Sequence, residues 1–185
     1  MTAVLLVGGE SRRMGHEKAT LVFRDKPLWQ TQLECLEKLQ PAEILLSARS
    51  DPGWRPSNVR FVADAAPSRG PLSGLAAALA AARTPHLLAL AVDMPFMTAQ
   101  YLRSLCDMIA PDRGVMPMID NRAEPLAAIY PVEVDVDLAV ALRGRDFSLQ
   151  SLAASLIAAG KLRAIAVPPR ERGLFRNLNE PADLS

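Results

Sequence analysis

Short apolar runs of β-strand length alternate with longer helical patterns along the first part of the chain, and this alternation constrains the fold most. The runs with strand character lie at residues 3–7, 43–47, 59–63 and 87–92. Helical patterns separate or follow them at residues 27–39, 72–82 and 98–110. Because repeats of strand, helix and strand place neighbouring strands parallel to each other, we predict a mostly parallel sheet covered by helices on both faces.

The second half of the chain is less regular but continues the same pattern. Further strands are expected at residues 114–118, 125–131 and 164–167, and further helices at 134–143 and 149–159. The polar, proline-containing segment 49–58 is expected to be an exposed loop. A length of 185 residues suits one core. We therefore predict a single three-layer α/β/α domain over residues 1–185.

Composition and charge argue against several functional classes. The chain has 21 lysine and arginine residues against 20 aspartate and glutamate residues, so broad binding to nucleic acid or to a membrane surface is not expected. Cys35 and Cys106 belong to no zinc-binding pattern. The apolar run at residues 85–92 is far shorter than the roughly 20 residues of a membrane helix. With no secretion signal in the first residues, we predict a soluble, cytoplasmic protein.

In parallel α/β sheets, ligands bind outside the carboxyl ends of the strands. In this chain that position falls on four residues that end or follow the predicted strands, which are Gly8, Ser47, Asp64 and Asp93. Asp93 follows an apolar strand and precedes a proline, so its carboxylate is a candidate ligand for a hard cation. An aspartate at a strand end can also cap a helix or form a turn.

A loop rich in glycines and cations follows the first strand. It runs from residue 8 to residue 18 and combines three glycines with Arg12, Arg13 and Lys18. Glycines let backbone amides approach phosphate oxygens, and the cations can neutralise them. The loop is not a P-loop, because Lys18 does not directly follow a glycine and is followed by alanine. The GxGxxG spacing of the dinucleotide-binding motif is absent too. A surface turn with solvated basic residues is the alternative from composition alone.

The order of residues in this loop resembles the signature of a nucleotidyltransferase superfamily. The string Gly-Gly-x-Ser-x-Arg-Met-Gly-x-x-Lys carries the likeness, and the paired Gly8 and Gly9 resemble the guanylyltransferases of molybdenum cofactor synthesis. Further matches follow in order along the chain at residues 26–29, 70–74, 93–96, 124–130 and 177–181. The sequence departs from the family at three positions, with Val7 in place of alanine, Ser47 in place of a nucleotide-contacting asparagine, and Met94 in place of threonine or serine.

The resemblance implies a Rossmann-like nucleotidyltransferase fold and a reaction in which GMP passes from GTP to the phosphate of molybdenum-bound molybdopterin with Mg²⁺. Lys18, Arg13 and Asp93 are then the catalytic residues, with Asp93 as the metal ligand. The nucleotide is expected to contact eight residues, which are Leu6, Val7, Gly8, Gly9, Lys18, Ser47, Asp64 and Asp93. Asp64 would accept hydrogen bonds from guanine or from the ribose hydroxyls. Asn177 and Asn179 would lie near the metal or the acceptor phosphate, although this string can also introduce a terminal helix.

Two alternatives stay open at this stage. One is a related transferase of cytidylyl or another nucleotidyl group, acting on molybdopterin or on a sugar phosphate. The other is a non-catalytic carrier of nucleotide or cofactor, against which the presence of both Lys18 and Asp93 argues. Transient contacts with cofactor-delivery or molybdoenzyme partners are expected for the guanylyltransferase.

Overall fold

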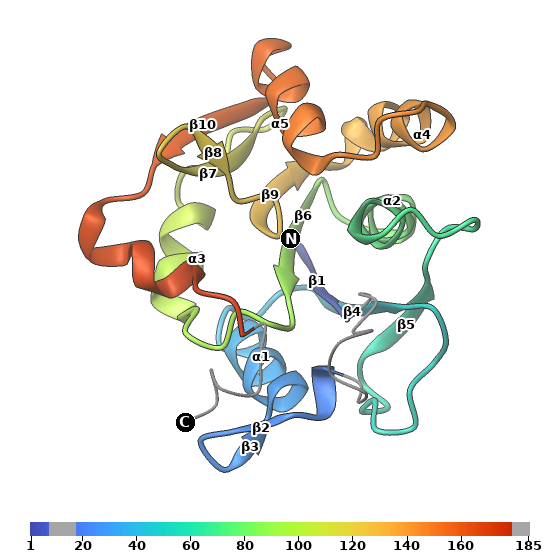
Figure 1. The fold of residues 1–185 in the computed structure, drawn as a ribbon, viewed down its shortest axis with the longest axis vertical. Coiled ribbons are helices and arrows are strands. Elements are labelled where there is room, and N and C mark those ends of the chain that lie inside the picture. Colours follow the sequence, from blue (N-terminus) through green and yellow to red (C-terminus); the bar gives the residue numbers. More distant parts are fainter. Residues whose placement is uncertain (8–17, 179–185) are drawn as a thin grey trace.

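The computed structural model describes residues 1–7 and 18–178 (Figure 1). The predictions for Gly8, Gly9, Arg13 and Asn179 fall outside these residues. The strands are β1 (Thr2–Leu6), β2 (Val22–Phe23), β3 (Lys26–Pro27), β4 (Glu43–Ala48), β5 (Arg60–Ala63), β6 (His86–Ala91), β7 (Gly114–Ile119), β8 (Arg122–Ala123), β9 (Ala127–Pro131) and β10 (Leu162–Ala166). The helices are α1 (Leu28–Glu37), α2 (Pro71–Ala81), α3 (Ala99–Cys106), α4 (Asp135–Arg143) and α5 (Leu149–Ala158), with short 3₁₀ turns η1 (Lys18–Thr20), η2 (Val132–Val134) and η3 (Pro169–Phe175).

The central sheet confirms the predicted α/β class with a mostly parallel arrangement. Its strand order is β10-β7-β9-β6-β1-β4-β5, and β8 pairs with β7. Strand β1 pairs in parallel with β4 and β6, β4 with β5, and β10 with β7. Strand β9 runs antiparallel to both of its neighbours, β6 and β7. The carboxyl ends of β1, β4, β5 and β6 therefore lie at one edge, where the ligand was expected.

Successive side chains of β1 point to opposite faces of the sheet, and this produces the three layers. Ala3 and Leu5 face the core formed with α1 and α3, whereas Val4 and Leu6 face the core formed with α2, α4 and α5. Figure 1 shows these two groups of helices on opposite faces of the sheet. Every residue of β1 is buried, which explains its continuous apolar run.

Local sequence signals set most helix boundaries. Pro71 occupies the first turn of α2, Thr98 accepts a hydrogen bond from the Tyr101 amide at 3.2 Å, and Ser148 accepts from the amides of Gln150 and Ser151. The expected helix at 98–110 is shorter than predicted, since α3 ends at Cys106. There the amides of Met108 and Ile109 bond to carbonyls three residues back, and Ala110 pairs with Arg113.

A small hairpin and one short strand were not predicted. Strands β2 and β3 form a hairpin whose turn residues, Arg24 and Asp25, have φ values of 50° and 66°. Glycine or asparagine is usual at such positions, so Arg24 and Asp25 did not indicate this turn. Strand β8 pairs antiparallel with β7 after a turn at Asp120 and Asn121, whose φ values are 47° and 64°.

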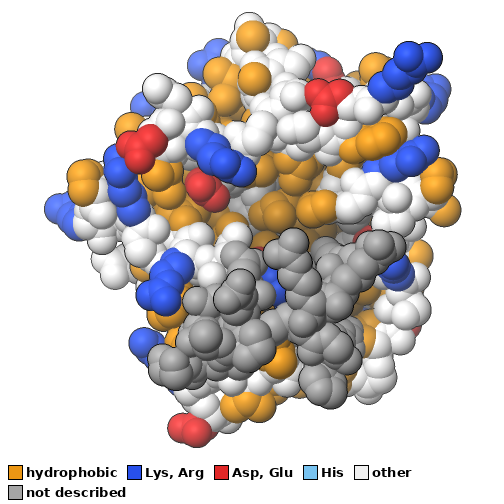
Figure 2. Space-filling model, viewed as in Figure 1, with side chains coloured by type: hydrophobic (Ala, Val, Ile, Leu, Met, Phe, Trp, Pro, Cys, Tyr) orange, Lys and Arg blue, Asp and Glu red, His pale blue; other side chains and the backbone are white. Residues whose placement is uncertain are grey.

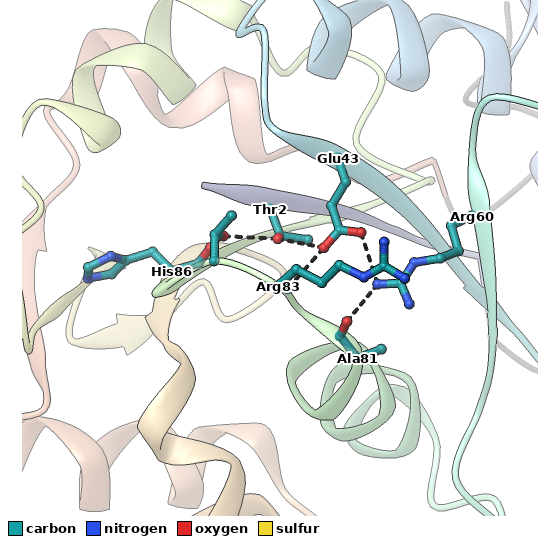
Figure 3. A network of polar contacts seen from close by, with 7 residues as sticks. Thr2, Glu43, Arg60, Ala81, Arg83 and His86 are labelled. Carbon is teal, nitrogen blue, oxygen red and sulfur yellow. Dashed lines mark hydrogen bonds and ion pairs between the residues drawn. The ribbon is translucent and has the colours of Figure 1, made fainter.

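A network of polar contacts lies at the amino-end edge of the sheet (Figure 3). The Glu43 carboxylate accepts hydrogen bonds from the Thr2 hydroxyl, the Arg83 amide and the Arg60 guanidinium, at 3.0, 3.0 and 2.9 Å. His86 begins β6 with 9% of its surface exposed, and its Nε2 lies 2.9 Å from the Ala110 carbonyl. His86 is thus a strand residue with a structural contact. Within the described ranges, no helix has the length and apolar character to cross a membrane.

Candidate active site

The central feature of the site is an ion pair between Lys18 and Asp93. Lys18 opens η1, and Asp93 lies two residues after β6. The Lys18 Nζ donates to Asp93 Oδ2 at 3.0 Å, and each side chain is 21% exposed. The two residues are 75 positions apart in sequence, so the fold brings the cation of the glycine-rich segment to the end of the central strand. This confirms that they share one location, while their catalytic roles remain a prediction.

Asp93 has the chemistry to hold a hard cation. Its Oδ2 takes the Lys18 bond, and the described residues give its other carboxylate oxygen no hydrogen bond. No cluster of three or more His, Cys, Asp or Glu side chains suited to a metal exists among the residues that the structure describes. Mg²⁺ is often bound by one or two carboxylates together with substrate phosphates, rather than by an all-protein cage. A single half-buried carboxylate that shares its site with substrate phosphates would therefore suit Mg²⁺.

A second cluster lies at the ends of β4 and β5. The buried Ser47 hydroxyl donates to Asp64 Oδ1 at 2.7 Å and lies 3.3 Å from the Gly74 carbonyl. The Asp64 amide in turn bonds to the Ala48 carbonyl at 2.9 Å, which fixes the aspartate at the strand edge. Asp64 is half-buried, and within the described part of the chain its Oδ2 has no hydrogen bond. Ser47 therefore orients Asp64, while nucleotide contacts by either residue remain predictions.

Gly74 is a residue of this cluster whose role the sequence did not reveal. A Cβ at this position would lie 2.9 Å from Ser47 Oγ, 3.1 Å from Asp64 Oδ1 and 3.2 Å from Leu6 Cδ2. The first helical turn of α2 can therefore approach the strand ends only because residue 74 has no side chain. The Gly-Pro-Leu-x-Gly motif signalled the turn, but the clearance became visible only in three dimensions.

The other predicted residues occupy the same edge of the sheet. The Val7 amide bonds to the Ser47 carbonyl at 2.9 Å, and the Leu6 carbonyl accepts from the Val92 amide at 3.1 Å. Asn177 is exposed, and the amide of Leu178, the next residue, bonds to the Asp93 carbonyl at 2.9 Å. The structure thus brings Leu6, Val7 and Asn177 to the strand ends that carry Ser47 and Asp93. Nucleotide and acceptor contacts by these residues remain predictions.

Two further side chains lie close to this edge. Arg69 precedes α2 and stacks its guanidinium over the Phe147 ring at 4.4 Å, which joins the start of α2 to the segment between α4 and α5. Glu124 lies two residues before Leu126, whose carbonyl accepts a hydrogen bond from the Ala91 amide at 2.9 Å. Burial raises the pKa of Glu124 above its ordinary value, and the nearby Arg122 partly offsets this shift. Glu124 was not singled out from the sequence, because one glutamate at a strand start has no distinguishing pattern.

The molecular surface on this side is concave. Figure 2 shows hydrophobic side chains on the floor of a hollow at the centre of the view, directly above the part drawn in grey. Charged side chains stand on the surrounding rim. The combination of an apolar floor and polar rim is usual for small-molecule sites.

Comparison with known proteins identifies the family. Residues 3–167 match the model of the MobA-like NTP transferase domain. The chain belongs to this family. A relative from Opitutus terrae, named as a probable molybdenum cofactor guanylyltransferase, is 34% identical over 99% of this chain and 92% of its own length. A molybdenum cofactor guanylyltransferase from Xanthomonas euvesicatoria is 32% identical over 100% of this chain and 92% of its own.

Solved structures agree with membership of the MobA-like family. The molybdopterin-guanine dinucleotide biosynthesis protein A of Archaeoglobus fulgidus superposes with a TM-score of 0.72 and 27% identity, covering 100% of this chain and 95% of that one. A 2-C-methyl-D-erythritol 4-phosphate cytidylyltransferase from Thermus thermophilus has a TM-score of 0.67 at 18% identity, and the superposition covers 98% of this chain and 94% of that one. The second likeness shows a shared fold alone. Together these neighbours confirm the expected nucleotidyltransferase fold, and family membership makes the chain a nucleotidyltransferase.

Proposed function

We propose that this nucleotidyltransferase moves GMP from GTP to the phosphate of molybdenum-bound molybdopterin, with Mg²⁺ as cofactor, releasing pyrophosphate. The observation that carries the proposal is the Lys18–Asp93 pair, which sets a cation and a carboxylate 3.0 Å apart at the carboxyl edge of the sheet. The names of the two full-length relatives support guanylyl as the transferred group and the molybdenum cofactor as the acceptor.

The reaction needs positioning and charge neutralisation more than proton transfer. The acceptor phosphate attacks the α-phosphorus of GTP in line with the departing pyrophosphate, and it is already ionised at neutral pH, so no general base is required. Lys18 would bind a phosphate oxygen and hold its charge during transfer. Asp93 would ligate Mg²⁺, which when bound withdraws charge from the phosphate oxygens. The ion pair between the two residues keeps both side chains oriented before substrates bind.

Nucleotide choice is proposed to depend on Asp64. Guanine offers an N1–H and an amino group as adjacent donors, and a carboxylate can accept both. The ribose hydroxyls are alternative donors for the same carboxylate. Transfer of a cytidylyl group is the second candidate, because Ser47 stands where the resembled guanylyltransferases carry a nucleotide-contacting asparagine.

The test is pyrophosphate release by the purified protein with Mg²⁺ and each of GTP, CTP, ATP and UTP, with and without molybdenum-loaded molybdopterin. We expect release only with GTP and the acceptor together, and loss of release in Asp93→Ala. Preference for CTP would overturn the nucleotide assignment alone. Binding of a nucleotide without turnover by active-site-intact protein would instead favour the non-catalytic carrier.

Action in the cytoplasm remains a prediction, as do transient contacts with cofactor-delivery proteins or molybdoenzymes. GTP and molybdopterin are the proposed small-molecule substrates, with no nucleic acid involved.

A further inference from the structure

An arginine and phenylalanine cluster lies beside the candidate active site. The rings of Phe23 and Phe96 meet edge to face with centroids 5.3 Å apart. The Arg24 guanidinium lies 5.1 Å from the Phe23 centroid and 5.8 Å from that of Phe96, and the Arg176 guanidinium lies 5.5 Å from Phe96. We name these four residues the Phe96 cluster.

The chain connects the Phe96 cluster directly to the site. Phe23 follows Lys18 by five residues, Phe96 follows Asp93 by three, and Arg176 immediately precedes Asn177. The bond from the Leu178 amide to the Asp93 carbonyl, at 2.9 Å, fixes the segment of Arg176 against that of Phe96. The segments next to Lys18, Asp93 and Asn177 therefore meet at the Phe96 ring.

Among the residues that the structure describes, the guanidinium groups of Arg24 and Arg176 have no carboxylate counter-charge. Both side chains are exposed, whereas Phe23 and Phe96 are half-buried and supply a fixed surface. Two like charges near one ring repel each other, and a bound anion would relieve that repulsion. Stacking on a ring restrains a guanidinium while leaving its N–H groups free to bind oxygens.

We infer that the Phe96 cluster binds the acceptor's phosphate group through Arg24 and Arg176. This inference rests on the proposed function, which requires a second phosphate beside the triphosphate site. A phosphate monoester presents several acceptor oxygens and a double negative charge, which suits two guanidinium groups better than a carboxylate would. Arg24 and Arg176 thereby help to guide the acceptor towards Asp93 and determine which acceptors are used.

The kinetic test compares Arg24→Ala, Arg176→Ala and the double variant with wild type, at saturating GTP and varied molybdopterin. We expect the acceptor KM to rise about 5- to 10-fold in each single variant, since charge-assisted hydrogen bonds are the stronger ones. The KM for GTP should change less than about 2-fold, in line with a contact made to the other substrate. Arg113→Ala is the matched control, because Arg113 is an exposed arginine just before β7, at the opposite edge of the sheet. An unchanged acceptor KM in the double variant overturns the inference.

A binding test separates this inference from the proposed reaction. With Mg²⁺ and a GTP analogue that resists cleavage filling the nucleotide site, inorganic phosphate is titrated while the arginine Nε–Hε signals are followed by NMR. We expect the Arg24 and Arg176 signals to shift together with one Kd, and the Arg113 signal to stay in place. Equal shifts of all three signals would mean general screening and would overturn the site. Wild-type protein that binds phosphate at Arg24 and Arg176 but never releases pyrophosphate would count against the proposed function alone.

Discussion

The Ser47 hydroxyl donates a 2.7 Å hydrogen bond to Asp64 Oδ1, and this bond links the ends of two adjacent parallel strands. Because a hydroxyl has one proton, the shorter contact to Asp64 takes it in preference to the Gly74 carbonyl at 3.3 Å. The described residues give Asp64 Oδ2 no hydrogen bond, so this oxygen is the one that we expect a ligand to use. We therefore predict that Ser47 affects nucleotide binding through Asp64.

Replacing Ser47 with alanine should weaken nucleotide binding. The change removes a buried donor to a carboxylate, a type of bond worth about 1.5–3 kcal/mol, so we expect the KM for GTP to rise about tenfold with a smaller change in kcat. In the Asp64→Ala background the same change should have no further effect on KM. Ser155→Ala, at an exposed serine of α5, is the control. Additive effects of the Ser47 and Asp64 substitutions would contradict a shared route.

Replacing Gly74 with alanine should disturb the same cluster from the helix side. The new methyl group would meet Ser47 Oγ at 2.9 Å and Asp64 Oδ1 at 3.1 Å, so one of the side chains or α2 must move. We expect a higher KM for GTP and a loss of about 1–3 kcal/mol in the free energy of unfolding, measured by denaturant titration. Gly53→Ala is the matched control, because no atom lies within 4 Å of its Cβ position. Equal effects at both glycines would argue against the steric explanation.

The Lys18–Asp93 pair leads to a prediction about metal and rate. Asp93→Asn keeps the shape of the side chain but removes the charge that would attract Mg²⁺, so we expect a loss of about 10²-fold or more in kcat and a higher Mg²⁺ requirement. Lys18→Ala should lower kcat to a similar degree without changing the Mg²⁺ concentration at half-maximal rate. The measurement is pyrophosphate release against Mg²⁺ concentration at fixed GTP. An Asp93→Asn enzyme with the wild-type Mg²⁺ dependence would remove Asp93 from the role of metal ligand.

Most strands of the sheet could be predicted from the sequence, whereas the side-chain contacts at its carboxyl edge could not. Buried strands such as β1 read clearly as apolar runs, and proline or a hydroxyl side chain marked the start of several helices. The β2–β3 hairpin was missed because Arg24 and Asp25 occupy turn positions where glycine or asparagine is typical. The carboxyl-edge rule selected Ser47 and Asp64 separately. Their bond depends on the pairing of β4 with β5, and the role of Gly74 depends on the approach of α2, and neither follows from local sequence.

The polar network of Figure 3 predicts a stability effect far from the chemistry. Glu43→Ala would leave the Arg60 guanidinium and the Arg83 amide without their shared acceptor, and the Glu43 side chain is only 16% exposed. We expect the free energy of unfolding to fall by about 1–3 kcal/mol, with KM and kcat of the folded protein unchanged. Glu37→Ala, at an exposed glutamate of α1, should change stability by less than about 0.5 kcal/mol. Equal losses in the two variants would show that the network adds nothing.

The burial of Glu124 leads us to expect that the stability of the protein depends on pH. Burial raises its pKa in the folded protein, so the folded state holds the proton more tightly than the unfolded chain, and stability falls as the pH rises from the unfolded pKa of about 4.3 through the raised value. Glu124→Gln cannot ionise and should raise Tm at pH 7, with the gain disappearing as the pH is lowered towards 4. Glu133→Gln, at a glutamate of η2, is the control. A gain that is constant from pH 4 to pH 7 would assign the effect to packing or hydrogen bonding in place of ionisation.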